Sequence, residues 1–460
     1  MLNSSTPQSA HETSLERGLG LREAVALNMI DMVGIGPFVV SSLVIREMGG
    51  PQALLAWVAG AVLALLDGFV WSELGAALPR AGGSYVFLRE AYGPERWGRL
   101  LSFLFVWQTL IQAPLVIASG AIGFAQYATY LHPLAAWQQK AVSGAVVVLL
   151  VVLLYRRITT IGKISVLLWI GVMATMLWLI AGGMTHFNAR LAFTFPPGAF
   201  RLSQVFFAGL GAAMVNTIYT YWGYYNICHL GGELKRPERN IPRGIFISIT
   251  GILVLYLLMQ TSILGVVPWQ KAQDSPFLVS TFVETLYGTR AASVATVLVL
   301  WIAFASIFSA LLGYSRVPYS AALDGNFFPV FARVHPRKHF PHLSLLFLGT
   351  LAFLFSLFFK LGTVIKAILA MRLLVQFIGQ AVGVMLLRRR WPAERMPFKM
   401  WFYPLPAVLT MLGWAALFWY TGPARKWGLL VIGLGGVAFL VRARVVREWP
   451  FAPGKQPKAA

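Results

Sequence analysis

Residues 24–45 read AVALNMIDMVGIGPFVVSSLVI, an apolar run that is interrupted near its middle by Gly34-Ile35-Gly36-Pro37. A helix needs about 20 apolar residues to cross a bilayer, so this run is long enough to span one. Glycine and proline weaken the helical hydrogen-bond ladder, and in lipid the backbone groups that they free must find other partners. The stretch therefore predicts a membrane helix that is broken halfway, beside a cavity that can supply those partners.

The composition of the whole chain agrees with a membrane protein. Of its 460 residues, 58% are hydrophobic and only 12% are charged, whereas about 25% are charged in an ordinary soluble domain. Similar apolar runs recur as far as Val441, and they are continuous rather than alternating, which excludes a transmembrane β-barrel. A single cysteine, Cys228, excludes an internal disulfide framework. We expect an all-α, polytopic membrane protein.

Pro/Gly-rich and charged joints divide the apolar sequence into twelve predicted membrane helices. We expect them near 24–45, 53–78, 100–130, 141–155, 160–184, 202–230, 244–267, 291–316, 343–360, 362–387, 404–420 and 427–445. With about 20 to 25 residues in each crossing, no separate soluble domain fits. The predicted parts are an N-terminal tail, two units of five helices each, two further helices and a C-terminal tail, with bounds at 1–22, 23–200, 201–390, 391–447 and 448–460.

The basic residues predict the orientation of these helices. Of 38 Lys and Arg residues, 27 fall on one predicted side of the membrane and ten on the other, while Arg372 lies inside a helix. Cytoplasmic loops carry an excess of Lys and Arg. We therefore expect both termini in the cytoplasm and the chain in the plasma (cytoplasmic) membrane. The net charge of +22 is then explained by membrane topology, and we expect no nucleic-acid partner. The alternative role for these cations is contact with anionic membrane lipid.

The first break is a candidate binding site for an anionic group. Amides at the start of a half-helix have no intrahelical partner and carry partial positive charge. Pro37 fits the first position of the outer half-helix but has no N–H, so the donors must be its neighbours. A proline kink that packs closely on glycine is the alternative interpretation. The candidate donors are Ile35, Gly36, Phe38 and Val39, and the candidate substrate-binding residues are Gly34, Ile35, Gly36 and Phe38.

The sixth predicted helix carries a second candidate break, at residues 219–225, where the sequence is YTYWGYY. Aromatic rings can close over a substrate, and carbonyls of a broken helix can accept hydrogen bonds from an ammonium group. Ordinary helix packing or an aromatic belt at the membrane surface are the alternatives. The candidate substrate-binding residues here are Tyr219, Thr220, Tyr221, Trp222 and Gly223.

The spacing of the two breaks suggests an inverted repeat. They fall in the first and sixth helices, five spans apart. Because an odd number of spans reverses the direction of the chain, two five-helix units would run antiparallel with one broken helix in each. Secondary transporters are built in this way, with the binding site between the broken helices.

Charged residues within predicted spans are costly and usually face a cavity, and four of them are informative here: Asp31, Asp67, Glu73 and Arg372. Asp31 lies one turn before the first break and Asp67 lies in the second helix, so both are candidate proton or cation sites. Hydrogen bonding of Asp31 to nearby backbone is the alternative. We expect Glu73 near the cytoplasmic end of its helix in a structural role. Arg372 can simply form an ion pair with an acidic side chain.

Nothing in the sequence favours a metal site, a cofactor or an enzyme. His229 and Glu233 are four residues apart, and His335, His339 and His342 share a basic loop, but a metal needs more ligands in a fixed geometry. Motifs for nucleotide binding, a serine nucleophile or zinc hydrolysis do not appear. A receptor or membrane enzyme that binds a ligand without moving it remains a less favoured alternative.

Three loops resemble amino acid permeases of the amino acid-polyamine-organocation superfamily. Residues 73–94, ELGAALPRAGGSYVFLREAYGP, are similar to the segment between helices two and three of that family. Residues 232–243, GELKRPERNIPR, resemble the loop after its sixth helix, and residues 324–329, DGNFFP, resemble the loop after its eighth. The three loops occur in the family's order, and the resemblance covers nearly the whole chain.

The resemblance implies the leucine-transporter-type fold, a five-plus-five inverted repeat followed by two helices. It also implies a secondary transporter that carries an α-amino acid by alternating access, as a symporter or antiporter that uses a coupling ion or a counter-substrate. By position, Ile35 and Gly36 would meet the substrate carboxylate and Tyr219 would be the outer gate. Backbone carbonyls would meet the amino group, namely those of Tyr219, Thr220 and Trp222.

The chain also departs from the family pattern. The family usually has small residues where Ile35 and Trp222 stand, so the pocket should be reshaped. The Gly-Pro-Phe variant at the first break, together with Asp31, resembles the polyamine-transporting branch. A transporter of polyamines or other organic cations with the same fold is therefore the alternative function.

Overall fold

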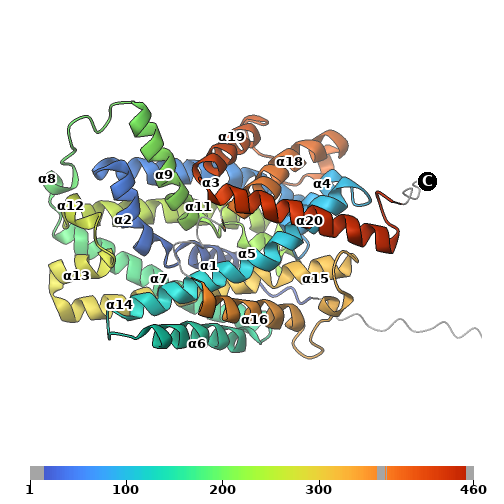
Figure 1. The fold of residues 1–460 in the computed structure, drawn as a ribbon, viewed down its shortest axis with the longest axis horizontal. Helices are drawn as coiled ribbons and strands as arrows, with labels where there is room; N and C mark the ends of the chain where they lie inside the picture. Colours follow the sequence, from blue (N-terminus) through green and yellow to red (C-terminus); the bar gives the residue numbers. More distant parts are fainter. Residues whose placement is uncertain (1–14, 360–367, 369, 452–460) are drawn as a thin grey trace, which may run out of the picture.

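The computed structural model describes residues 15–359, 368 and 370–451, and these ranges form a bundle of helices without a β-sheet. Figure 1 shows the long helices running side by side along the long axis of the molecule. The helices of the first half are α1 (Leu21–Met32), α2 (Gly36–Met48), α3 (Leu54–Ala77), α4 (Ser84–Tyr92), α5 (Trp97–Ala128), α6 (Ala136–Leu154), α7 (Ile158–Thr185), α8 (Ala189–Ala192), α9 (Gln204–Tyr221) and α10 (Asn226–His229).

The second half continues with long helices and short connecting ones. These are α11 (Pro237–Leu264), α12 (Trp269–Ala272), α13 (Leu278–Tyr287), α14 (Thr289–Tyr314), α15 (Arg316–Leu323), α16 (His342–Phe358), the π-helical turn η4 (Leu373–Ile378), α18 (Gly379–Arg390), α19 (Leu405–Tyr420) and α20 (Ala424–Val446). Short 3-10 turns lie at η1 (Pro51–Ala53), η2 (Gly231–Glu233), η3 (Pro329–Ala332) and η5 (Ala393–Arg395).

Eight helices of the described ranges are long and apolar enough to cross a membrane, and the bent pair α1 and α2 would make a ninth span. Two further predicted spans correspond to the shorter apolar helices α16 and α19. The sixth predicted span is divided between α9 and α10. The first residues of the predicted helix 362–387 lie outside the described residues. The prediction of an all-helical, multi-pass membrane protein is confirmed, whereas the total of twelve spans stays a prediction.

Several helix bounds differ from the predicted ones for local reasons. The helix expected from 244 begins at Pro237, because proline is favourable at the first helical position. The structure also contains α4 and α13, which lie in predicted connections and are too short to give a membrane-spanning signal. These differences change the lengths of the connections and leave the order of the long helices intact.

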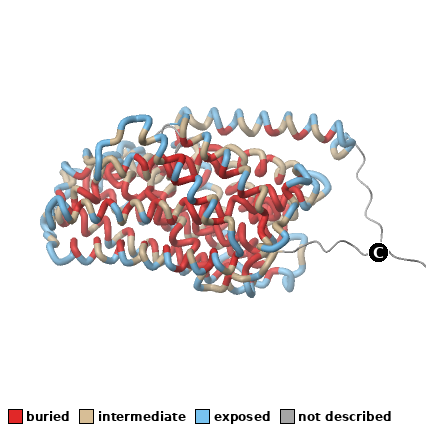
Figure 2. Tube along the Cα trace, turned by 90° about the horizontal axis from the view of Figure 1, so that it is seen from below, coloured by how far each residue is buried: buried red, intermediate tan, exposed pale blue. Residues whose placement is uncertain are grey.

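The burial pattern separates the centre of the bundle from its outer face. Of the most apolar window of α5, 67% is buried, compared with 17% for α20. Figure 2 shows the C-terminal helix lying against the outside of the bundle with most of its residues exposed. In a bilayer such exposed apolar side chains face lipid. The site described next is formed by the inner helices α1, α2, α5, α9 and α14.

Candidate functional site

The first membrane helix is interrupted where its Gly and Pro residues predict. Helices α1 and α2 meet at an angle of 46° across residues 33–35. The amides of Phe38 and Val39 both donate to the carbonyl of Ile35, at 3.2 Å each. Of the four predicted donors, these two are therefore occupied. The amides of Ile35 and Gly36 remain without a hydrogen-bond partner among the described residues.

The predicted sixth span is interrupted at residues 222–225, within the predicted stretch. Helix α9 ends as Trp222 adopts an extended conformation, and Gly223 follows with φ of +120°. A Cβ atom on Gly223 would lie 2.7 Å from the Cβ of Asp31. Glycine is thus required here both by the backbone conformation and by the close approach of α1. The interruption after α9 is thus in direct contact with the last turn of α1.

A cavity of about 60 Å³ lies between the two interruptions. It is roomy enough for small polar molecules, since a site for one water needs roughly 10–15 Å³ by the same kind of measure. Its walls come from α1, α2, α5, α9, α14 and the turn before η4. Lining residues that the sequence predicted are Asp31, Gly34, Ile35, Gly36, Tyr219, Thr220, Trp222 and Gly223.

Two polar groups at the cavity form hydrogen bonds within the protein. The hydroxyl of Ser306, on α14, donates to the carbonyl of Asp31 at 3.1 Å. The carbonyl of Thr220 accepts a hydrogen bond from the hydroxyl of Tyr256 at 3.1 Å. Of the three carbonyls expected to meet an amino group, that of Thr220 is therefore already engaged. The side-chain carboxylate of Asp31 forms no hydrogen bond or ion pair with any residue in the described ranges.

Arg372 is a cavity residue whose role the sequence did not reveal. Its side chain is 2% exposed and forms no salt bridge within the described part of the chain. Its Nε donates to Gln376 at 2.8 Å, and its guanidinium carbon lies 4.7 Å from the centre of the Trp222 ring and 5.5 Å from that of Tyr314. Its Nη2 has no hydrogen-bond partner among the described residues. The guanidinium is thus held by aromatic faces and keeps a donor free.

Three predicted site residues do not line this cavity. The side chain of Phe38 is packed in the core at 1% exposure. The hydroxyl of Tyr221 donates to the carbonyl of Trp57 at 3.1 Å, which turns the ring away from the cavity. Asp67 is fully buried on α3 and accepts hydrogen bonds from the three surrounding donors of Trp71, Tyr224 and Trp414.

A second hollow, of about 470 Å³, lies one helical turn beyond the cavity, away from the basic loops. Ile35 and Gly120 line the cavity, while Val39 and Gly123 line the hollow. Between the two, the hydroxyl of Tyr219 lies 3.5 Å from that of Ser119 on α5. Ile35 lies between the cavity and the larger hollow, because its Cγ2 would be 3.2 Å from a Cβ atom on Gly123.

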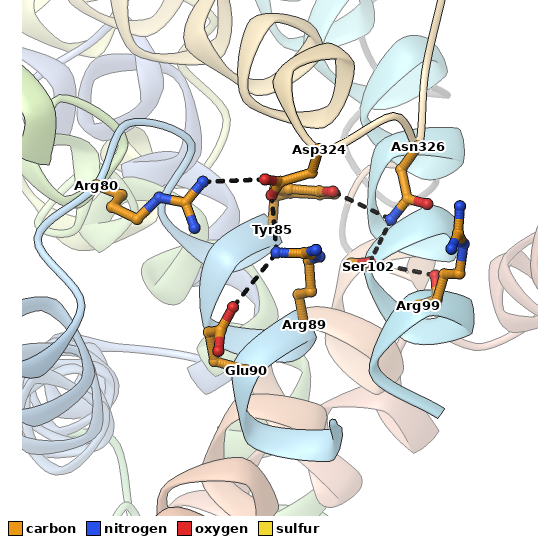
Figure 3. A network of polar contacts seen from close by, with 8 residues as sticks. All are labelled: Arg80, Tyr85, Arg89, Glu90, Arg99, Ser102, Asp324 and Asn326. Atoms are coloured by element: carbon orange, nitrogen blue, oxygen red, sulfur yellow. Dashed lines mark hydrogen bonds and ion pairs between the residues drawn. The ribbon is translucent and has the colours of Figure 1, made fainter. Parts of the chain in front are cut away.

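The loops that resemble the permease motifs meet at the opposite, basic end of the bundle. Figure 3 shows Asp324 between two arginines, 3.1 Å from Arg80 and 3.2 Å from Arg89. In the same network the amide of Asn326 donates to the hydroxyl of Tyr85 at 3.0 Å. Burial and the Asp324 carboxylate raise the pKa of Tyr85 well above its usual value, so this hydroxyl stays neutral at physiological pH.

Two buried ion pairs reinforce this end. Arg316 forms two hydrogen bonds with Glu233, at 2.6 and 2.8 Å, and the side chains are 1% and 0% exposed. Glu73, also fully buried, is bonded by Arg388 and by the amide of Met400, at 2.8 Å. The expected structural role of Glu73 agrees with these contacts. Together the contacts link the connecting segments at the basic end of the bundle to the neighbouring helices.

We expect Arg316→Met to lower the free energy of unfolding by about 3–5 kcal/mol, because it leaves the buried Glu233 carboxylate without a counter-charge. Thermal and denaturant unfolding of the purified protein would measure the change. The double variant Arg316→Met with Glu233→Gln should recover much of the loss. Arg80→Gln serves as the control, since its partly exposed pair with Asp324 should contribute less than about 1 kcal/mol. Equal losses in both arginine variants would contradict the prediction.

No group of three or more His, Cys, Asp or Glu side chains is arranged to hold a metal ion within the described ranges. His229 is buried, with its Nδ1 3.3 Å from the carbonyl of Gly82 and its ring packed on Phe105. Glu233, four residues later, is engaged by Arg316. The described residues bring to the cavity backbone amides and carbonyls, hydroxyls, one carboxylate, one guanidinium and aromatic rings.

The amino acid permease family matches residues 19–439 of the chain. The chain is 28% identical over 405 residues to cationic amino acid transporter 4 of Mus musculus, with 83% of the chain and 61% of that protein covered. It is 24% identical over 406 residues to the serine/threonine exchanger SteT of Bacillus subtilis, with 87% and 90% covered. It is 25% identical over 453 residues to the human cystine/glutamate transporter, with 95% and 87% covered.

Proposed function

The chain belongs to the amino acid permease family, and on that premise we propose that it is a secondary active transporter that moves amino acids by alternating access. The observation that carries the proposal is the cavity between two interrupted helices, where free amides meet aromatic side chains. Two relatives that align with this chain over most of their own length are named as an amino acid exchanger and an amino acid transporter.

The substrate carboxylate is proposed to bind at the start of α2. There the amides of Ile35 and Gly36 have no hydrogen-bond partner in the described part of the chain, and the helix dipole gives this end of α2 a partial positive charge. The ammonium group is proposed to face the Asp31 carboxylate and the end of α9, where peptide carbonyls point beyond the last helical turn. This arrangement matches both charges of a zwitterion with groups of opposite sign.

The free donor of Arg372 bears on the substrate class. A guanidinium in the wall repels a cationic side chain and can bind an acceptor on a neutral or acidic one. Glutamate, a substrate in the name of one relative, carries such an acceptor. Polyamine or organic-cation transport is the second candidate, and Asp31 favours it, but Arg372 beside the same cavity disfavours it. We therefore propose neutral or acidic amino acids as the substrates.

The two ends of the bundle suggest which step of the cycle the conformation represents. Ion pairs link the segments at the basic end, while a hollow of about 470 Å³ lies beyond Ile35 on the other side. With the basic end in the cytoplasm of a plasma membrane, this would be a state that releases to or loads from the outside. Tyr219 would act as the outer gate.

The wider arrangement is proposed from the same premise. Residues 23–200 and 201–390 would form the two antiparallel units, followed by two helices within 391–447, with both termini cytoplasmic. A coupling ion or counter-substrate would drive the cycle. Asp31, beside the cavity, is the proposed proton or cation site, while the three donors around Asp67 favour a structural role for that residue.

Uptake by purified protein in liposomes tests the function. Radiolabelled neutral and acidic amino acids should accumulate, either with an imposed ion gradient or against an internal counter-substrate, and putrescine should compete poorly. Accumulation of putrescine without uptake of any amino acid would favour polyamine transport over amino acid transport. Binding of an amino acid without any flux would instead favour a receptor.

Tyr219→Ala should reduce uptake by at least about tenfold, because it removes from the cavity wall the ring that is the proposed outer gate. Tyr219→Phe keeps the ring and loses only the long contact with Ser119, 3.5 Å between hydroxyl oxygens, so it should retain more than about half of the uptake. Initial rates of amino acid uptake would measure both. A larger loss in the phenylalanine variant would assign the role to the hydroxyl rather than to the ring.

A further inference from the structure

A groove runs along the outer face of the bundle between α6 and α16, which lie side by side at the lower edge of Figure 1. Its apolar part is a hollow of about 250 Å³. Its other part is a hollow of about 580 Å³ that shares Val151, Val152 and Leu346 with the first, so the two are continuous. We name the two together the α6–α16 groove.

The floor of the apolar part is formed by close helix contact. A Cβ atom on Gly349 would clash with the Cγ2 of Val151, so the two helices approach each other there with no room for a further side chain. The walls remain open, since Val148, Val152 and Leu346 are 51%, 58% and 40% exposed. In a protein that spans a membrane, this apolar face meets acyl chains rather than water.

Among the residues that the structure describes, the lining at the other end of the groove includes three cations and no acidic side chain. Arg156, Arg157 and Lys338 line it, and none of them forms a salt bridge within the described ranges. Lys338 is held in place, because its Nζ donates to the carbonyl of Tyr155 at 2.8 Å and lies 4.5 Å from the centre of that ring. The Nε of Arg157 donates to the carbonyl of Arg337 at 3.2 Å, which leaves its terminal nitrogens available.

The order of apolar wall, aromatic ring and cations matches the depth profile of one leaflet. From Val147 to Tyr155 the helix rises by about 12 Å, close to the roughly 15 Å of hydrocarbon in half a bilayer. Tyrosine is favoured at the boundary between hydrocarbon and headgroups, and Lys and Arg lie beyond it. The cations therefore lie at the level of lipid phosphates when an acyl chain occupies the apolar part.

We propose that the α6–α16 groove binds one anionic phospholipid from the leaflet on the basic side of the membrane. An acyl chain lies against Val148, Val152 and Leu346. The headgroup phosphate is bound by Arg156, Arg157 and Lys338. A zwitterionic lipid would carry a compensating cation into a region that already holds three, and a soluble anion would leave the apolar wall uncovered. Charge and shape together select an anionic lipid.

Lipid titration of the purified full-length protein, followed by native mass spectrometry, tests this site. Phosphatidylglycerol and phosphatidylcholine with identical acyl chains are the probes. Each Lys or Arg near an anionic headgroup contributes about fivefold in affinity, so we expect at least about tenfold tighter binding of phosphatidylglycerol. The triple variant Arg156→Gln, Arg157→Gln, Lys338→Gln should remove this preference. Equal binding of both lipids by the unmodified protein would overturn the proposal.

Two further variants separate this site from a general effect of surface charge. The matched control Arg389→Gln, Arg390→Gln, Lys399→Gln removes the same charge from exposed positions outside the groove and should keep the preference. Leu346→Trp fills the apolar part with all three cations intact and should weaken phosphatidylglycerol binding by at least about fivefold. Loss of preference in the control triple, or unchanged binding in Leu346→Trp, would contradict the proposal. Competition by soluble glycerol phosphate at equal concentration would show a free-anion site and also overturn it.

Discussion

Gly36→Val is expected to reduce amino acid uptake by more than about 100-fold while the protein still folds and inserts. A Cβ atom at this position would lie 3.1 Å from the Cγ2 of Thr220 and 3.4 Å from the ring of Tyr219. Valine adds two further carbons, and its β-branched side chain cannot easily rotate away. These atoms would occupy the space through which a carboxylate must approach the amides of Ile35 and Gly36. Initial uptake rates in liposomes, at matched protein density, measure the effect.

Gly433→Val is the matched control for this substitution. Gly433 also lies in a membrane helix, but a Cβ atom there would meet no described atom within 4 Å. Its uptake should equal that of the unmodified protein. Gly36→Ala should be intermediate, because the single methyl group touches Thr220 without filling the cavity. Uptake by Gly36→Val at the unmodified rate would remove the start of α2 from the binding site.

Arg372→Gln is expected to weaken acidic substrates most and to relieve the exclusion of cationic ones. A hydrogen bond to a charged group contributes about 1.5–3 kcal/mol, which corresponds to roughly 10- to 150-fold in affinity. An acidic amino acid should lose affinity in this range, whereas a neutral amino acid of similar size should lose less than about fivefold. Competition by acidic, neutral and cationic amino acids against one labelled neutral substrate gives these ratios.

Arg425→Gln controls for the loss of an arginine that stacks on an aromatic ring. The guanidinium of Arg425 lies 4.3 Å from the centre of the Trp419 ring, away from the cavity. Its ranking of competitors should match that of the unmodified protein. If Arg372→Gln also left the ranking unchanged, Arg372 would be a packing residue, and the proposed restriction to neutral or acidic amino acids would lose its support.

The sequence predicts the helices and the interruption of the first one because both depend on local properties. A long apolar run specifies a membrane helix through its length, and Gly36-Pro37 interrupts the hydrogen-bond ladder wherever the chain is placed. The same reasoning does not extend to α4 and α13. Their sequences are short, and their helical form is stabilised by packing against longer helices, which no local pattern encodes.

The cavity is only partly predictable for the same reason. Gly34, Ile35 and Gly36 are recognisable from their chemistry within one segment. Arg372 is recognisable as an unusual charge, but its surroundings come from distant segments: Trp222 follows α9 and Tyr314 ends α14. The carboxylate of Asp67 shows the converse, because its donors Tyr224 and Trp414 approach from elsewhere in the chain and engage a group that appeared free.

The contact between Gly223 and Asp31 has a mechanical consequence. Since Gly223 packs against the last turn of α1 with no room for a side chain between them, a displacement of either segment must displace the other or break this contact. A joint movement that keeps the contact intact requires a pivot outside it. Gly49 and Gly50, with φ of +71° and +156° after α2, offer the backbone freedom for such a pivot. A substitution that restricts the backbone at Gly49 or Gly50 would slow the transport cycle without contacting the substrate.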